Sequence, residues 1–159
     1  MLAAWHGIRK KRNRERQQGI FKERMDMSLL VMGTVALDDI QTSSGVRKDL
    51  LGGSASHFSM SASLFTPTHI VGVVGRDFPK RHLHLFVSKG IDVSSLQIKD
   101  GKTFHWTGEY DAKDWNSAIT RATELGVLQG YAPRVTPAQA KMKHLFLAND
   151  DPDAQMDLL

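Results

Sequence analysis

The stretch LLGGSASHFSMSASLF, residues 50–65, places two adjacent glycines directly before a run that contains no helix breaker. Glycine loses more conformational freedom on folding than any other residue, so a glycine pair at a helix start needs a physical reason. One reason is a simple turn, and another is a ligand that must come close to the backbone of Gly52 and Gly53. We expect a helix over residues 54–64, with Ser54 as its N-cap.

Apolar runs that favour β-structure lie on both sides of this helix and predict a sheet. Residues 28–37 (SLLVMGTVAL) and 69–75 (HIVGVVG) are typical of buried strands. Further strands are expected at 126–133 and 144–150, with a short helix between them that begins at Thr136-Pro137. Because these strands alternate with helices, they indicate a mostly parallel α/β sheet.

Two segments fall outside this alternation and indicate a small second sheet. Residues 38–51 contain a Ser-Ser-Gly turn between polar flanks, which predicts a hairpin. Residues 102–110 (KTFHWTGEY) alternate in character, with Phe104 and Trp106 on one face, as is typical of a half-exposed strand. We expect these segments to form a separate sheet, or flap.

Length and composition fit one soluble globular domain and exclude several other classes. The chain has 159 residues and no cysteine, so a disulfide scaffold and a thiolate metal site are excluded. No apolar run approaches the roughly 18 residues that a membrane-spanning helix needs. We therefore expect no membrane partner and a cytoplasmic protein.

All of the net positive charge lies in residues 1–26, which we interpret as a basic, disordered extension. This segment holds eight Lys and Arg against three acidic residues, whereas residues 27–159 hold 13 against 14. A basic run attracts phosphate, so the extension could contact nucleic acid or a membrane surface. We favour a solvated extension and expect no nucleic-acid partner.

Several motifs of known chemistry are absent from the sequence. There is no Gly-x-Gly of a dinucleotide fingerprint, no Gly-Lys-Ser/Thr of a phosphate-binding loop and no Gly-x-Ser-x-Gly elbow. His82 and His84 are two residues apart on an expected helix, so they point to different faces. We therefore expect no metal site in this chain.

Polar residues gather where the expected strands end and the helices begin, which is where ligands bind in open α/β sheets. Asp38 follows the first strand, Asp150 follows the last, and Asp77 follows the second, where it could cap the next helix. Carboxylates and free backbone amides suit the hydroxyls of a polyol. Trp106 could cover the apolar face of a sugar ring or a nucleobase, although packing within a sheet would also explain it.

Six segments resemble, in order and in approximate spacing, the ribokinase-like, PfkB-type carbohydrate kinases. They are VMGTVALDD, LLGGSASHFSMSAS, VGVVGRDFP, GIDVSSL, GKTFHWTGEY and FLANDDPDAQ. The resemblance covers residues 28–159 and implies an α/β, ribokinase-like three-layer sandwich, here its N-terminal half, with a small β-sheet lid. We interpret residues 27–159 as the N-terminal part of a PfkB-type kinase domain, with lid strands near 40–50 and 102–110.

The resemblance also implies ATP-dependent phosphorylation of a sugar or nucleoside hydroxyl. In the family's pattern, Asp38 binds sugar hydroxyls, and Gly52 and Gly53 let the sugar approach the backbone. The residue at the position of Asp150 often contacts the substrate too. The asparagine that usually follows four positions after the second glycine is His57 here, which leaves the identity of the sugar open.

The family's catalytic segment is missing from the chain. Neither Gly-Ala-Gly-Asp, which carries the catalytic base and the anion hole, nor the Asn-x-x-Glu associated with Mg²⁺ occurs in the sequence. We therefore expect no catalytic residue here, and we expect ATP and Mg²⁺ to serve the full-length family member. The final DPDAQMDLL predicts a short helix, and the sequence looks cut short. The alternative is a non-catalytic carbohydrate-binding protein that forms a homodimer through the lid sheet.

Overall fold

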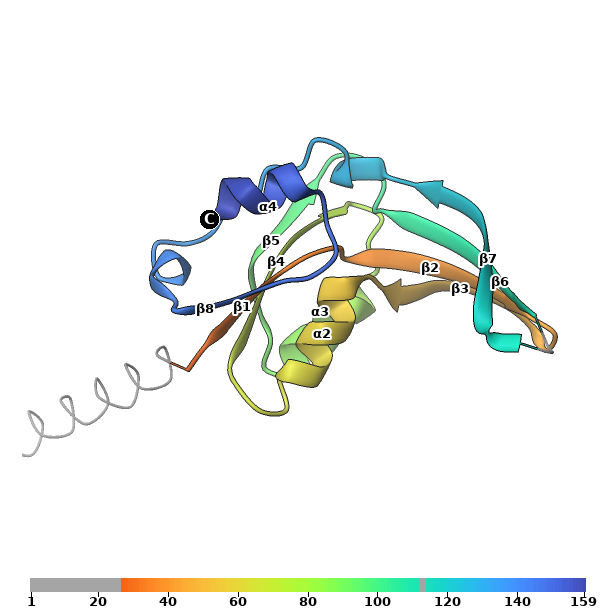
Figure 1. Ribbon diagram of the computed structural model, residues 1–159, viewed down its shortest axis with the longest axis horizontal. Helices are drawn as coiled ribbons and strands as arrows, with labels where there is room; N and C mark the ends of the chain where they lie inside the picture. Colours follow the sequence, from red (N-terminus) through yellow and green to blue (C-terminus); the bar gives the residue numbers. More distant parts are fainter. Residues whose placement is uncertain (1–26, 112–113) are drawn as a thin grey trace, which may run out of the picture.

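The apolar run at residues 28–37 divides between two sheets. A computed structural model describes residues 27–111 and 114–159, so the basic extension 1–26 lies outside the described residues. The first strand ends at Met32, and the chain then enters a second sheet at Ala36 (Figure 1). The elements are β1 (Leu29–Met32), β2 (Ala36–Thr42), β3 (Gly45–Gly52), α2 (Ser54–Ala62), β4 (Thr68–Gly75), α3 (Lys80–Ser88), β5 (Asp92–Lys99), β6 (His105–Asp111), β7 (Asp114–Glu124), the 3₁₀ turns η1 (Gly126–Leu128) and η2 (Gln139–Lys141), β8 (His144–Leu147) and α4 (Pro152–Leu158).

The first sheet has the strand order β5-β4-β1-β8, and all of its strand pairs are parallel. Helices α2 and α3 cover one face, and α4 lies over the other (Figure 1). Side chains alternate accordingly: Val31 and Ile70 belong to one buried apolar cluster, whereas Met32 and Val71 belong to the other. Because both faces of the sheet are covered, the predicted α/β three-layer arrangement is confirmed.

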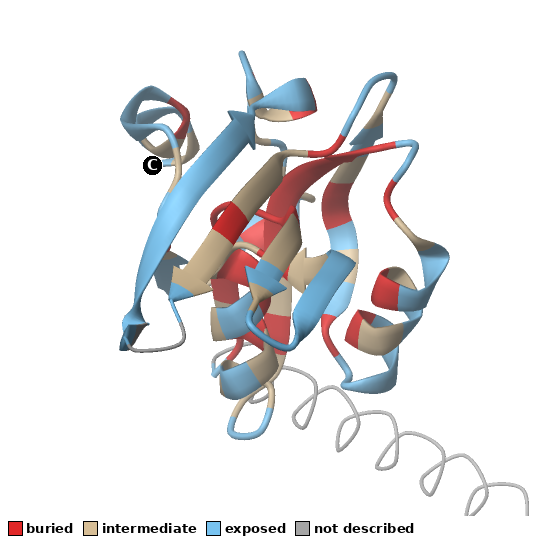
Figure 2. Ribbon diagram, turned by 90° about the vertical axis from the view of Figure 1, so that its right-hand side faces the viewer, coloured by how far each residue is buried: buried red, intermediate tan, exposed pale blue. Residues whose placement is uncertain are grey.

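The second sheet has the order β3-β2-β6-β7 and is mixed, because β2 pairs with β6 in parallel while the two outer pairs are antiparallel. It extends away from the body of the molecule (Figure 1), and we call it the projecting sheet. Buried residues gather in the body, whereas most positions of the projecting sheet are exposed or half-buried (Figure 2). The predicted hairpin and the separate sheet are therefore confirmed.

One predicted strand is wrong. Residues 126–133 form the 3₁₀ turn η1 and a loop, because Gly126 adopts a φ of 54° and the Val127 N–H donates to the Lys102 carbonyl at 2.8 Å. The short helix expected at Thr136-Pro137 is reduced to the single turn η2. Strands β5 and β7 were not predicted, since their sequences are rich in polar residues and lack an apolar run.

The residue expected to cap the second helix has another role. Helix α3 begins after Pro79, and Asp77 instead accepts hydrogen bonds from the backbone N–H and the hydroxyl of Thr103, both at 2.8 Å. Burial opposes ionisation of Asp77, but these two hydrogen bonds lower its pKa below the ordinary value. The Thr103 hydroxyl also accepts from the Gly75 N–H at 3.0 Å, so the chain entering β6 is fastened to the end of β4.

In the described part of the chain, no helix combines the length and the apolar character that crossing a membrane requires.

Candidate functional site

The glycine at position 52 makes room for the carboxylate of Asp38. Asp38 lies on β2 and Gly52 ends the neighbouring strand β3, and a Cβ atom at Gly52 would come within 2.1 Å of one Asp38 carboxylate oxygen and 2.4 Å of the other. Burial raises the pKa of Asp38, while the nearby His57 and His105 act in the opposite direction. The structure thus places three of the predicted site residues, Asp38, Gly52 and His57, near one another.

Gly53 adopts a conformation that side chains rarely allow, with a φ of 92° and a ψ of 147°. A Cβ atom there would lie 2.3 Å from the Thr34 carbonyl oxygen and 2.8 Å from the Ala36 nitrogen. The space beside Gly53 is therefore filled by the backbone that connects β1 to β2. An added Cβ atom at either glycine would therefore meet the chain's own atoms.

Helix α2 begins without a side-chain cap, so the prediction that Ser54 is the N-cap is wrong; the N-cap position is Gly53. The Ser54 hydroxyl instead donates to the Asn149 carbonyl at 2.9 Å. The same carbonyl accepts from the N–H of Thr34 at 3.1 Å and from its hydroxyl at 2.7 Å. Asn149 therefore joins the end of β8 to the end of β1 and to the start of α2.

Asp150 lies just beyond β8, close to the side chain of Tyr131. One of its carboxylate oxygens accepts from the Asp151 N–H at 2.8 Å, and the other is buried with no hydrogen-bond partner. Burial raises the pKa of Asp150, and burial together with the charge of Asp150 raises the pKa of Tyr131. The neighbour of Asp150 in this structure is thus Tyr131, which the sequence did not single out.

Trp106 lies beside Asp38 on the projecting sheet. The two residues are register partners in the β2–β6 ladder, so their side chains leave the same face of the sheet. The indole covers Gly108, because a Cβ atom there would lie 1.9 Å from Cη2 of the ring. Its Nε1 donates to the Thr120 hydroxyl on β7 at 3.1 Å. An aromatic ring and a half-buried carboxylate therefore stand together on one face.

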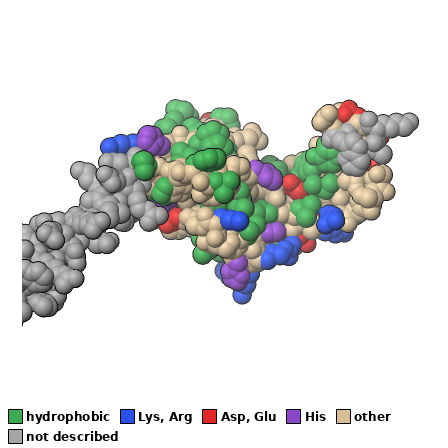
Figure 3. Space-filling model, turned by 90° about the horizontal axis from the view of Figure 1, so that it is seen from below, with side chains coloured by type: hydrophobic (Ala, Val, Ile, Leu, Met, Phe, Trp, Pro, Cys, Tyr) green, Lys and Arg blue, Asp and Glu red, His purple; other side chains and the backbone are tan. Residues whose placement is uncertain are grey.

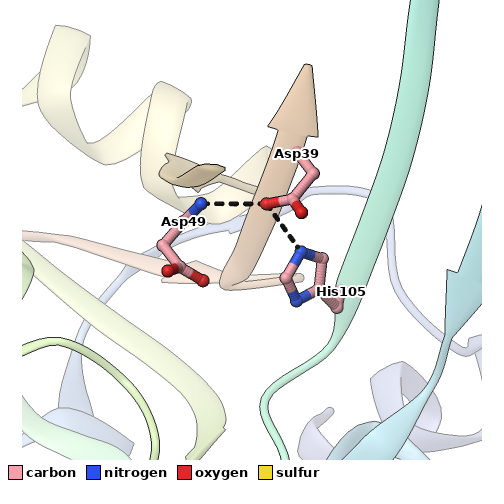
Figure 4. Close-up of side chains that lie close together, drawn as sticks. All are labelled: Asp39, Asp49 and His105. Atoms are coloured by element: carbon pink, nitrogen blue, oxygen red, sulfur yellow. Dashed lines mark hydrogen bonds and ion pairs between the residues drawn. The ribbon is translucent and has the colours of Figure 1, made fainter. Parts of the chain in front are cut away.

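The opposite face of the projecting sheet carries a polar cluster of Asp39, Asp49 and His105 (Figure 4). The Asp39 carboxylate accepts from the Asp49 N–H at 2.9 Å and pairs with His105 Nε2 at 3.1 Å. Burial opposes ionisation of Asp39, but the Asp49 N–H and His105 hold its pKa below the ordinary value.

This cluster lies where the pairing of β2 with β3 is irregular. The β2–β3 register shifts between Asp38 and Ile40, and Asp49 has a φ of 51°. The Asp49 carbonyl contacts Arg81 Nη2 at 2.8 Å and His82 Nε2 at 2.9 Å, and both residues lie on α3. The three residues offer ligand atoms within 4.8 Å of one another, a spacing that a metal ion would accept. The hydrogen bonds of this cluster, including those between the Asp49 carbonyl and α3, hold the projecting sheet against the body and are sufficient to explain the arrangement.

A groove lies between α2 and β8. It has a volume of about 530 Å³, and Phe58 stacks on Phe146 in it with ring centroids 3.6 Å apart. Its lining residues are Ser54, His57, Phe58, Ser61, Phe146, Leu147, Ala148 and Asn149. Seen from below, His and acidic side chains lie where the body meets the projecting sheet (Figure 3). His57 lines this groove and also lies near the Asp38 carboxylate.

Known proteins resemble this chain both in sequence and in structure. No family model matches the chain. A cytidine kinase of Thermococcus kodakarensis is 31% identical over 137 residues, which cover 84% of this chain and 47% of the relative. The chain thus spans about half the length of the curated relative that it matches.

Solved structures are similar over a comparable part of their length. A ribokinase from Cryptococcus neoformans in complex with ADP matches with a TM-score of 0.68 and 21% identity, over 82% of this chain and 43% of that one. A nucleoside kinase of Burkholderia thailandensis in complex with inosine matches with a TM-score of 0.57 and 19% identity, over 64% of this chain and 36% of that one. The chain therefore has a partial ribokinase-like fold, and its resemblance to the ribokinase-like, PfkB-type kinases is confirmed.

Proposed function

We propose that this chain is the substrate-binding part of an ATP-dependent sugar or nucleoside kinase. The observation that carries the proposal is the pairing of Asp38 with Trp106 on one face of the projecting sheet, next to the start of α2. A carboxylate accepts hydrogen bonds from hydroxyl groups, and an indole packs on the apolar face of a ring. The partial ribokinase-like fold and the 31% identity to a cytidine kinase support the same reaction class.

In this proposal each predicted site residue has a stated role. Asp38 accepts hydrogen bonds from substrate hydroxyls, Gly52 leaves the space in which that carboxylate sits, and Gly53 fixes the start of α2. His57 faces Asp38 and lines the groove between α2 and β8. Asp150, whose neighbour is Tyr131, contacts the substrate from the end of β8.

In such kinases ATP supplies the phosphoryl group and Mg²⁺ neutralises its charge. Catalysis of the transfer consists largely of positioning and charge stabilisation. The residues present here do not fit that task. The sequence contains neither Gly-Ala-Gly-Asp nor Asn-x-x-Glu, the segments that carry the catalytic base and the Mg²⁺ association in this family's pattern. We therefore derive no catalytic step from this chain, and we expect the 159-residue protein alone to turn over no ATP.

The test is ligand binding by the purified 159-residue chain. Isothermal titration or NMR titration against ribose, hexoses and nucleosides is expected to find a weak ligand that perturbs residues near Asp38 and 52–57. A hydrogen bond to a charged acceptor contributes about 1.5–3 kcal/mol, so Asp38→Asn should lower the affinity by roughly 10- to 150-fold. A folded chain that binds none of these ligands, or that binds equally well after Asp38→Asn, contradicts the proposal.

A homodimer through the projecting sheet stays part of the proposal. Val46 on β3 and Ile119 on β7 are 58% and 52% exposed and would lose contact with water if a partner covered the projecting sheet. A second copy of the sheet could cover them. Sedimentation analysis of the wild type and of a Val46→Lys variant tests this point: a dimer that the variant weakens supports it, and a monomeric wild type contradicts it.

A further inference from the structure

We propose that Trp106 is a platform for the base of a nucleoside, and that Gly108 and Thr120 are positioning residues that hold the indole in place. This inference rests on the proposed function, because it assumes that Asp38 binds the hydroxyls of the same ligand. It adds the substrate class: a nucleoside and not a free sugar.

The indole is held at two points. Gly108 lies two residues after Trp106 on β6, and the six-membered ring occupies the space above it, with Cη2, Cζ2 and Cζ3 at 1.9, 2.3 and 2.5 Å from an ideal Cβ position. Any side chain at position 108 would displace the ring. At the other end, the indole N–H donates to the Thr120 hydroxyl at 3.1 Å, across the β6–β7 pair. A side chain with few rotatable bonds and two fixed points is preorganised for stacking.

The position of the ring matches a second group in the same ligand. Trp106 and Asp38 are direct neighbours across the parallel strands β2 and β6, and neighbouring strands lie about 4.8 Å apart. A nucleoside joins a polyol directly to a planar base, so the carboxylate can bind the ribose hydroxyls while the base lies against the indole. A free pentose can use the carboxylate but has no planar ring to place on the indole.

The experiment compares ribosides that carry a base with one that carries none. Cytidine, adenosine and methyl β-D-ribofuranoside are titrated against the 159-residue chain, with binding followed by calorimetry. Stacking of a base on an aromatic side chain is worth about 1–3 kcal/mol, so the nucleosides should bind about 5- to 150-fold more tightly than the riboside. In a chain that carries Trp5→Phe and Trp115→Phe, nucleosides should quench the remaining tryptophan fluorescence and the riboside should not.

Variants separate the positioning role from a structural one. Thr120→Val removes the hydroxyl that accepts from the indole, so it should weaken nucleoside binding several-fold and leave riboside binding unchanged. Thr120→Ser keeps the hydroxyl and should restore nucleoside affinity. Gly108→Ala should have a larger effect in the same direction. Thr107→Val is the matched control, because Thr107 lies on β6 but on the opposite face of the sheet.

The outcomes distinguish this inference from the proposed function. If the riboside and the nucleosides bind equally, or if Thr120→Val and Thr107→Val have the same effect, the platform inference is wrong while the sugar site stands. If neither class of ligand binds the folded chain, the proposed function fails and the inference fails with it. Tighter nucleoside binding that depends on Thr120 supports both.

Discussion

Gly53→Ala should destabilise the chain more than a substitution at any open glycine, because two costs add at this position. The first is backbone conformation: a φ of 92° with a ψ of 147° is strained for a side chain, at a cost of about 1–3 kcal/mol. The second is steric, since the new Cβ would lie 2.3 Å from the Thr34 oxygen and 2.8 Å from the Ala36 nitrogen. Backbone atoms cannot rotate away, and overpacking of this kind costs about 1–3 kcal/mol.

The sum is about 2–6 kcal/mol, against a total stability of about 5–15 kcal/mol for a typical domain. For a chain of this size each kcal/mol lowers Tm by about 2–4 °C, so the fall should be on the order of 10 °C. The Thr34 carbonyl also accepts from the Ala55 N–H at 3.0 Å, so the substitution would push the start of α2 away from the first sheet. Thermal unfolding followed by circular dichroism measures the change.

Gly90→Ala is the matched control. Gly90 has a φ of 72°, and an added Cβ would meet no atom within 4 Å. Only the cost of the left-handed conformation applies there, about 1–2 kcal/mol. Equal reductions of Tm in Gly53→Ala and Gly90→Ala would show that the contact with residues 34–36 contributes nothing, and the reasoning about the glycine pair would fail.

Three further predictions concern single side chains. Asp38→Asn should raise Tm at pH 7. Burial raises the pKa of Asp38 above its unfolded value, so the wild type loses stability as the pH rises through the folded pKa. Asparagine does not ionise, so the variant avoids this loss. An unchanged or lower Tm at pH 7 would contradict this. Asp39→Asn should make the free energy of unfolding depend less on pH in acid. The lowered pKa of Asp39 stabilises the wild type above about pH 4, and this contribution is lost as the pH falls through the folded pKa. Thermal melts between about pH 2 and about 6 test the prediction. Gln139→Leu should cost about 1–3 kcal/mol in urea unfolding, because it leaves the buried Ser95 hydroxyl, now 2.5 Å from the amide oxygen, without an acceptor.

The sequence predicted the parts of the fold that repeat a simple pattern. The apolar runs at 69–75 and 144–150 became β4 and β8, and the Ser-Ser-Gly turn became the β2–β3 hairpin, because hydrophobic run length and turn chemistry act locally. The run at 28–37 predicts one strand, but it forms β1 and the start of β2. The chain changes sheet at Gly33, where a side chain would lie 2.7 Å from the Ala148 Cβ, and that contact is made by a residue far along the chain.

The candidate site was predicted in its residue types and not in its contacts. Asp38 and Trp106 could be named from strand ends and alternation, and the structure makes them neighbours. That Gly52 accommodates the Asp38 carboxylate, and that Tyr131 lies near Asp150, depend on the packing of distant segments. Thr120 lies on β7, a strand whose polar sequence gave no signal.

The pairing of β8 with β1 has a consequence for how the chain folds. Leu29 pairs with His144, and the hydrogen bonds from Thr34 to Asn149 join residues 115 positions apart. Contacts of such long sequence separation form late, because the entropy of closing the intervening loop must be lost before the contact stabilises anything. During synthesis, β1 can pair with β4 as soon as residue 71 has emerged, but its other edge stays open until β8 arrives. The early intermediate therefore exposes the backbone of β1 and the side chains of α2 that later line the groove, and at this stage the chain is most exposed to aggregation and to chaperones.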